Sequence, residues 1–75
     1  MLVKTIDKNV ITSKFAENVL VMRYRKHISQ EKLAEMIGIS TNHISNIENQ
    51  RSVPTFPIVV NLCRILEIDL NQFLK

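Results

Sequence analysis

The sequence of 75 residues contains one glycine, one cysteine and no tryptophan. A single glycine excludes the glycine-rich loops that cradle phosphates in nucleotide-binding enzymes. The one cysteine, Cys63, cannot form an internal disulfide, and because it lies in an apolar helical stripe we interpret it as a small buried residue rather than a nucleophile. No Cys/His cluster has the spacing of a metal site. We therefore expect a protein that is not an enzyme and that holds no metal and no cofactor.

Long apolar runs, low-complexity tracts and Gly/Ser linkers are also missing. No stretch approaches the roughly 20 apolar residues that cross a bilayer, and residues 1–4 do not begin a signal peptide, so we expect a cytoplasmic protein without a membrane partner. The length indicates one domain, and no pocket for a small molecule can be inferred. The net charge of +3 and the pI near 9.4 suit a polyanionic partner without requiring one.

Residues 29–49 predict two short capped helices around one tight turn. The only glycine, Gly38, lies at this turn, where a residue free to adopt left-handed backbone angles can end one helix and redirect the chain. Ser29 and Ser40 each precede apolar residues at helical spacing, as N-caps do. The pattern predicts helices over 30–37 and 41–49, and together they form a helix-turn-helix.

The second of these helices would expose short, mostly uncharged side chains. Ile44 and Ile47 face inward, together with Ile39 in the preceding turn. The open side then carries Thr41, Asn42, Ser45, Asn46 and Asn49. Asn can pair with adenine in the major groove, and Ser and Thr hydroxyls can serve several base edges. The alternative is a polar surface helix without a partner.

From about Val19 to Leu74 the chain resembles the Cro- and phage-repressor-like helix-turn-helix family of bacterial and phage regulators, also called the XRE family. The resemblance implies an all-α, five-helix lambda-repressor-like DNA-binding domain over residues 13–75, with the helix-turn-helix formed by helices 2 and 3. The matching residues are Arg23 seven residues before Gln30, then Ser29-Gln30-Glu31-Lys32-Leu33-Ala34, Gly38-Ile39-Ser40, Ile44-Ser45-Asn46-Ile47-Glu48-Asn49, Pro54-Thr55, and Leu62-Cys63-Arg64-Ile65-Leu66-Glu67-Ile68-Asp69-Leu70.

Caps and periodicity predict the other elements. The first helix should span residues 13–26 with Phe15, Val19 and Met22 inward, and residues 1–12 form an N-terminal arm of uncertain order. A fourth helix should begin near Phe56 behind a Thr55 cap. Asp69 and Gln72 resemble a capping box that opens a short last helix.

Two positions where relatives often have glycine carry other residues here. His27 should adopt a left-handed conformation at the end of the first helix. After the second helix of the motif, there are two alternatives: Gln50 adopts a left-handed conformation, or the helix ends in a different way.

The resemblance also assigns roles to individual residues. Thr41, Asn42 and Asn46 would read base edges, with Ser45 as a weaker candidate. Phosphate contacts would come from Gln30, His43, Asn49 and Arg51, although Arg51 can also be read as a solvated charge. Arg23 and Glu48 would form a structural ion pair beneath the recognition helix. Lys14 and Lys32 are interpreted as solvated charges.

These expectations combine into a sequence-specific transcriptional regulator of double-stranded DNA, with repression as the favoured mode. Because one module reads few base pairs, we expect a homodimer on a palindromic operator. Candidate dimer surfaces are the N-terminal arm and the apolar residues near the C-terminus: Ile68, Leu70, Phe73 and Leu74. The alternative is a protein-interaction module, such as an antitoxin-type regulator whose main partner is a protein.

Overall fold

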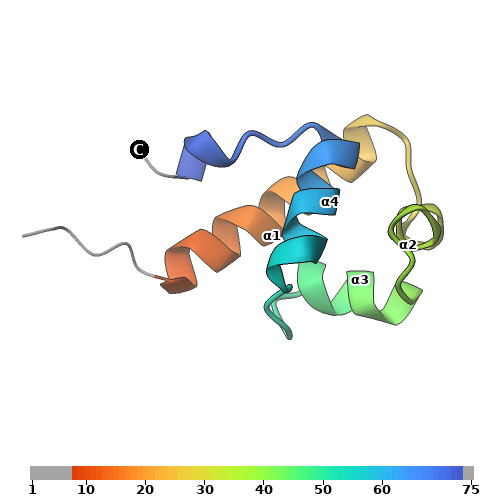
Figure 1. Ribbon diagram of the computed structural model, residues 1–75, viewed down its shortest axis with the longest axis horizontal. Coiled ribbons are helices and arrows are strands. Elements are labelled where there is room, and N and C mark those ends of the chain that lie inside the picture. The colour runs from red at the N-terminus through yellow and green to blue at the C-terminus, as the bar shows by residue number, and fades with distance from the viewer. Residues whose placement is uncertain (1–7, 74–75) are drawn as a thin grey trace, which may run out of the picture.

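The computed structural model describes residues 8–73, with only the backbone of Gln72 and Phe73. It contains α1 (Lys8–Arg25), α2 (Gln30–Ile37), α3 (Thr41–Glu48), α4 (Phe56–Leu66) and a 3₁₀ turn, η1 (Leu70–Phe73), and this part of the chain has no strand (Figure 1). The all-helical expectation is confirmed. The expectation of five helices is wrong, because the described residues form four α-helices.

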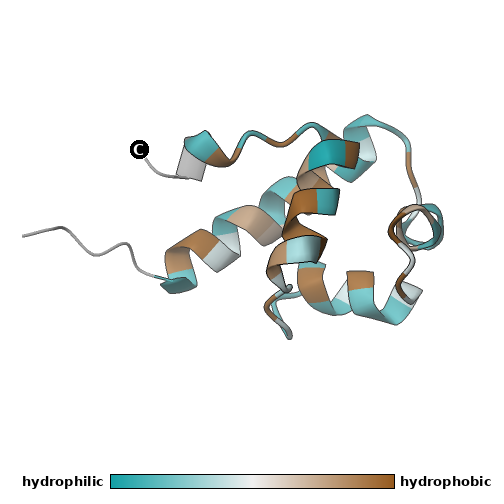
Figure 2. Ribbon diagram, in the orientation of Figure 1, coloured by the Kyte–Doolittle hydropathy of each residue, from teal (hydrophilic) through white to brown (hydrophobic). Residues whose placement is uncertain are grey.

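Apolar side chains from every α-helix form one core. Figure 2 shows α2 and α3 with their hydrophobic residues turned inward and their hydrophilic residues turned outward. The largest side chains with almost no exposed surface are Val19, Leu33, Ile44, Ile47, Leu62 and Leu66. Since α2 and α3 contribute four buried residues, Leu33, Ala34, Ile44 and Ile47, their packing fixes which residues remain outside.

The first helix begins at Lys8, five residues before the expected start at Ser13. Ile11, Phe15 and Val19 follow one another at intervals of four residues, which is helical spacing. The other apolar residues near the N-terminus are irregularly spaced and obscured this pattern. Ile11 is half-buried and Phe15 is buried, so the inward stripe continues into the first turns of α1. Residues 1–7 of the expected N-terminal arm lie outside the described residues.

The expected last helix is a single 3₁₀ turn. The Asp69 carboxylate accepts a hydrogen bond from the N–H of Asn71, two residues on, rather than from the third residue as a capping box requires. A segment this short gains too few hydrogen bonds to offset the cost of nucleating an α-helix. Leu74 lies outside the described residues. At the start of α4, Thr55 holds the N-cap position, but its side chain makes no capping hydrogen bond.

All four α-helices end in the same way. A residue one or two positions after each helix terminus has a positive φ: His27 at 57°, Gly38 at 87°, Gln50 at 61° and Glu67 at 58°. The next N–H then donates to a carbonyl five residues back, in the bonds Ile28 to Arg23, Ile39 to Ala34, Arg51 to Asn46 and Ile68 to Cys63. The left-handed conformation of His27 was expected from the sequence and that of Gln50 was one of two alternatives, whereas that of Glu67 was not expected.

Candidate nucleic-acid interface

Two serine caps and one glycine build the connection between α2 and α3. The N–H of Lys32 donates to Oγ of Ser29, and the N–H of His43 donates to Oγ of Ser40, each over 3.0 Å. Between the helices the N–H of Gly38 donates to the carbonyl of Ala34 at 2.8 Å. A Cβ at Gly38 would meet no atom within 4 Å, so this position needs glycine for its left-handed backbone and not for space.

A buried ion pair joins α1 to α3. Nε and Nη2 of Arg23 donate to the two carboxylate oxygens of Glu48 at 2.7 and 3.1 Å, a bidentate arrangement. The two side chains are 8% and 3% exposed. The hydrogen bonds to Glu48 raise the pKa of the Arg23 guanidinium, although burial acts in the opposite direction. The guanidinium therefore lies against Glu48, the only residue of α3 with a formal charge.

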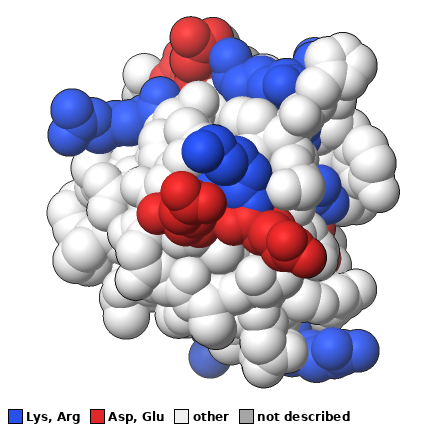
Figure 3. All heavy atoms as spheres, turned by 90° about the vertical axis from the view of Figure 1, so that its right-hand side faces the viewer, with Lys and Arg blue, Asp and Glu red and all other residues white. Residues whose placement is uncertain are grey.

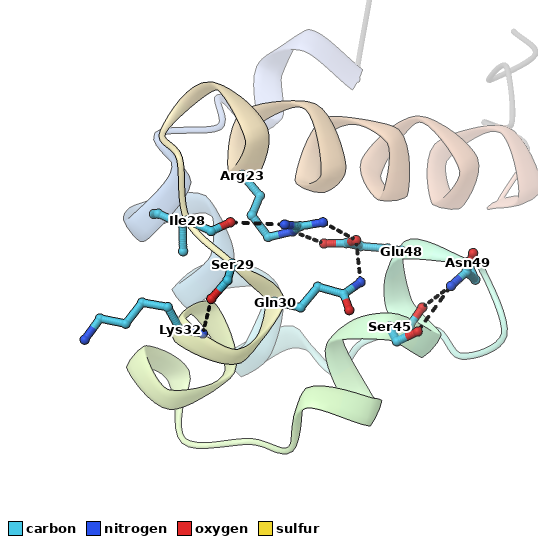
Figure 4. A network of polar contacts seen from close by, with 8 residues as sticks. All are labelled: Arg23, Ile28, Ser29, Gln30, Lys32, Ser45, Glu48 and Asn49. Atoms are coloured by element: carbon cyan, nitrogen blue, oxygen red, sulfur yellow. Dashed lines mark hydrogen bonds and ion pairs between the residues drawn. The ribbon is translucent and has the colours of Figure 1, made fainter.

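The same pair holds two further segments, as Figure 4 shows. Nη1 of Arg23 donates to the carbonyl of Ile28 at 3.0 Å, and Nε2 of Gln30 donates to Glu48 at 3.0 Å. Gln30 is the first residue of α2, so one network ties α1, the turn after it, α2 and α3 together. Gln30 was expected to bind a phosphate. Its amide oxygen and second amide hydrogen are not used by Glu48, and the side chain is half-buried.

The candidate base-contacting residues all lie on α3. Thr41 and Asn42 are exposed in its first turn, and Ser45 and Asn46 are half-buried further along. The side-chain amide of Asn49 donates to the carbonyl of Ser45 at 2.9 Å and to its hydroxyl oxygen at 3.3 Å (Figure 4). Asn49 is therefore partly engaged within α3, a contact that sequence reasoning missed.

The candidate phosphate contacts lie at both ends of this face. Gln30 is at the start of α2, whereas Asn49 and Arg51 are exposed just after α3. His43 is half-buried in α3. A shallow polar hollow brings the starts of α2 and α3 together, and it is lined by Arg23, Tyr24, Ser29, Gln30, Glu31 and Thr41.

Tyr24 is a member of this hollow that the sequence analysis did not single out. Tyr24 is 65% exposed, and the Arg23 guanidinium lies over its ring, 4.7 Å from the ring centroid. One signal in the sequence could have pointed to Tyr24. It directly follows Arg23, the predicted structural arginine, and lies outside the apolar stripe of α1.

Charge is unevenly distributed around α2 and α3. In Figure 3 acidic side chains lie near the centre and at the top of the face shown, whereas its lower part, where α3 lies in Figure 1, is uncharged except for basic side chains at the bottom edge. On α2, Lys32 lies 3.8 Å from Glu35 in an exposed ion pair, so neither contributes an isolated charge. On the face shown, the edge that carries α3 thus exposes no acidic group that would repel a polyanion.

Metal binding, thiol chemistry and membrane insertion have little support in residues 8–73. Within residues 8–73, no group of three His, Cys, Asp or Glu side chains could hold a metal ion. Burial raises the pKa of the Cys63 thiol, which lowers its thiolate fraction at neutral pH. None of the described helices combines the length and the apolar character that a membrane span requires.

Residues 21–73 match the family model for helix-turn-helix proteins, HTH_3. The chain belongs to this XRE-type helix-turn-helix family. The matched residues run from the last five residues of α1 to η1, so they include both helices of the motif and the Arg23–Glu48 pair. The fold of this family member also matches a solved regulator. The crystal structure of the clp gene regulator ClgR from Corynebacterium glutamicum superposes with a TM-score of 0.75 at 19% identity, over 85% of this chain and 68% of that one.

Two curated relatives come from Bacillus and one of its phages. The ImmF control region 10 kDa protein of Bacillus phage phi105 is 33% identical over 49 residues, 65% of this chain and 54% of that protein. The uncharacterized HTH-type transcriptional regulator YqaE of Bacillus subtilis (strain 168) is 28% identical over 61 residues, 81% of this chain and 53% of that protein. This helix-turn-helix chain therefore spans about half the length of the curated relatives it matches.

Proposed function

We propose that the protein is a sequence-specific transcriptional regulator of double-stranded DNA that places α3 in the major groove. The observation that carries this proposal is the outward face of α3, which presents short neutral donors and acceptors while its one carboxylate is buried against Arg23. Such a face can approach base edges without electrostatic repulsion from the phosphates on either side. In this role the chain acts as a cytoplasmic binding protein and not as an enzyme.

The base-reading residues in this proposal are Thr41, Asn42, Ser45 and Asn46. Thr41 and Asn42 are exposed, so their side chains are accessible to base edges. The Ser45 hydroxyl oxygen accepts from Asn49, which leaves its hydrogen to donate to a base acceptor. Asn46 is half-buried, and the exposed part of its amide would contact a further base.

The phosphate contacts would flank the groove on both sides. Gln30 offers an amide at the start of α2, where the positive end of the helix also favours an anion. Arg51 and Asn49 would meet a phosphate beyond the end of α3, with His43 as an additional contact. Contacts of this kind fix the position of the domain on DNA and carry no sequence information.

Repression and a homodimeric state complete the proposal. One relative belongs to a phage control region and another is named an HTH-type transcriptional regulator, which supports a regulatory role. A single recognition helix reads only a few base pairs, so two copies on a palindromic operator, with half-sites about 34 Å apart, give useful specificity.

Selection from random duplex DNA tests the proposal. The purified chain should enrich one roughly palindromic sequence, and binding to that sequence should resist added salt better than binding to random DNA does. If no sequence is enriched and the binding disappears at moderate salt, only nonspecific electrostatic attraction remains. The chain would then be a protein-interaction module, such as an antitoxin-type regulator.

A further inference from the structure

The side chains of α3 do not include those that usually read guanine. Guanine presents two acceptors in the major groove, O6 and N7, and proteins most often read them with an arginine or a lysine. The helix Thr41–Glu48 contains neither residue type. Its only basic side chain is His43, which is half-buried one helical turn before the buried Ile47, at the side of the outward face. Arg51 is exposed beyond the end of α3, where it meets a phosphate in the proposed function.

The position of Glu48 excludes a carboxylate contact to cytosine. A carboxylate can accept a hydrogen bond from the N4 amino group of cytosine, and Glu48 is the only acidic residue of α3. Both of its oxygens are already bonded: Oε2 accepts from Arg23, and Oε1 accepts from Arg23 and from Gln30. The Glu48 side chain is 3% exposed, and Figure 4 shows it turned toward Arg23. No carboxylate of α3 is therefore available to a cytosine.

Two free amides remain on the outward face of α3. Asn42 and Asn46 lie one helical turn apart, and no hydrogen bond within residues 8–73 holds the side-chain amide of either residue. The amide of Asn49, by contrast, donates to Ser45. An asparagine amide carries a donor and an acceptor side by side, which match N7 and the N6 amino group of adenine in two hydrogen bonds. Against guanine the amide oxygen would face a second acceptor, and against cytosine only one bond forms, so adenine fits each free amide best.

Resting on the proposed function, we infer that α3 reads A·T base pairs, with one adenine opposite Asn42 and another opposite Asn46. The two residues are separated by about 6 Å along the helix, more than the rise of about 3.4 Å between base pairs, so they meet different base pairs. The neighbouring side chains fit the same pairs, because the methyl group of Thr41 can contact a thymine methyl and the Ser45 hydroxyl can donate to O4 of thymine. The part of each half-site that faces α3 is therefore an A·T segment.

Selections from random duplex DNA with the wild type, Asn42→Ala and Asn46→Ala locate the base pair that each amide reads. Each variant should lose the preference at a different base pair, and the wild type should select A·T at both. Asn61→Ala is the matched control, because Asn61 is an exposed asparagine of α4 that makes no proposed DNA contact. This control should select the wild-type site. Thermal melts establish that all four proteins are folded.

Replacement of single adenines by 7-deazaadenine tests the contact itself. The analogue lacks the N7 acceptor but keeps the N6 amino group and the base pairing. At the base pair assigned to Asn42, it should weaken wild-type binding about tenfold and weaken Asn42→Ala binding no further. Asn46 and its own base pair should behave in the same way. The analogue placed outside the segment that faces α3 is the DNA control and should have no effect.

Failure of this inference and failure of the proposed function give different results. Guanine or cytosine opposite Asn42 and Asn46, or an equal effect of 7-deazaadenine on the wild type and the variants, would overturn adenine reading while leaving a sequence-specific regulator. An A·T preference that neither alanine variant relaxes would also overturn it, because the preference would then come from the shape of the DNA. If no sequence is enriched, the proposed function fails and adenine reading fails with it.

Discussion

The guanidinium of Arg23 bonds both to Glu48 on α3 and to the carbonyl of Ile28 in the turn after α1. Removing one member of a buried ion pair leaves the other charge uncompensated, and this typically costs about 3 to 5 kcal/mol. Arg23→Ala should therefore lower the free energy of unfolding by an amount in this range, measured by urea denaturation followed by circular dichroism. The pair Arg23→Met/Glu48→Leu is the control, because removing both charges should cost less than removing either one. If Arg23→Ala has the same free energy of unfolding as the wild type, Arg23 has no structural role.

Base contacts and phosphate contacts should respond differently to truncation. Asn42→Ala should cost about 1 to 3 kcal/mol on the selected site and relax the preference at one base pair, because the exposed amide would lose its base partner. The loss is measured by titrating the selected duplex and a single-base variant set. Equal weakening on specific and random DNA would exclude Asn42 from base reading.

Arg51→Ala should instead weaken binding to every sequence and reduce the slope of log K against log salt by about 1. Lys14→Ala is the charge-matched control, because Lys14 is exposed on α1 and is interpreted as a solvated charge. If both variants lose affinity equally, only the net charge of the chain matters and Arg51 makes no located contact.

At the scale of helices, the four matching C-terminal ends differ in one respect. The residue after the left-handed position is isoleucine at three ends, and Ile28, Ile39 and Ile68 all belong to or pack on the core. At the end of α3 the equivalent residue is Arg51, which is exposed. This terminus lacks the apolar contact that usually accompanies the motif. Only at the end of α3 does an exposed cation stand where the other helix ends have a core isoleucine. This difference agrees with a phosphate contact by Arg51.

Gly38 and Gln50 both have left-handed backbone angles, so substitutions at these two positions should have opposite effects on stability. Gly38→Ala should destabilise the fold by about 1 to 2 kcal/mol, because φ is 87° and no atom nearby gives the new methyl a favourable contact. Gln50→Gly should leave stability unchanged or raise it by up to about 1 kcal/mol, since it removes strain but adds freedom to the unfolded chain. Thr55→Gly is the control, because its φ of −69° needs no glycine and its side chain makes no capping hydrogen bond. Chemical denaturation measures all three, and a stability loss in Gln50→Gly would show that the strain is absent.

Local chemistry explains which elements could be predicted from the sequence. The bounds of α2 were predicted correctly because Ser29 and Gly38 mark them, and α3 ends one residue before the predicted Asn49. Asp7 precedes α1 in the sequence and is a residue type common at N-caps, but the irregular apolar spacing around it gave no helical pattern. The contact of Gln30 with Glu48 joins residues 18 positions apart and depends on how α2 and α3 pack, which no local pattern encodes.

At the scale of the molecule, only ten apolar residues are buried among those described, so each interaction is a large share of a small stability. Ile68 belongs to this core, so it is not available as the dimer contact suggested by the sequence. Leu70, also suggested, is exposed. The two residues lie two positions apart in the sequence, yet Ile68 is buried and Leu70 is exposed. Hydrophobicity alone does not predict which of two neighbouring apolar residues is buried.

This marginal stability links folding to DNA binding. A ligand that binds only the folded state at one hundred times its Kd adds about 2.7 kcal/mol, so the selected operator should raise the Tm of the wild type by roughly 10 to 20 °C. It should also restore much of the folded population of Arg23→Ala, since that variant keeps every proposed DNA contact. Asn42→Ala should melt like the wild type without DNA but gain less from the operator. Differential scanning calorimetry with selected and scrambled duplexes measures both, and an Arg23→Ala protein that gains nothing from the operator would place Arg23 in the DNA-binding machinery itself.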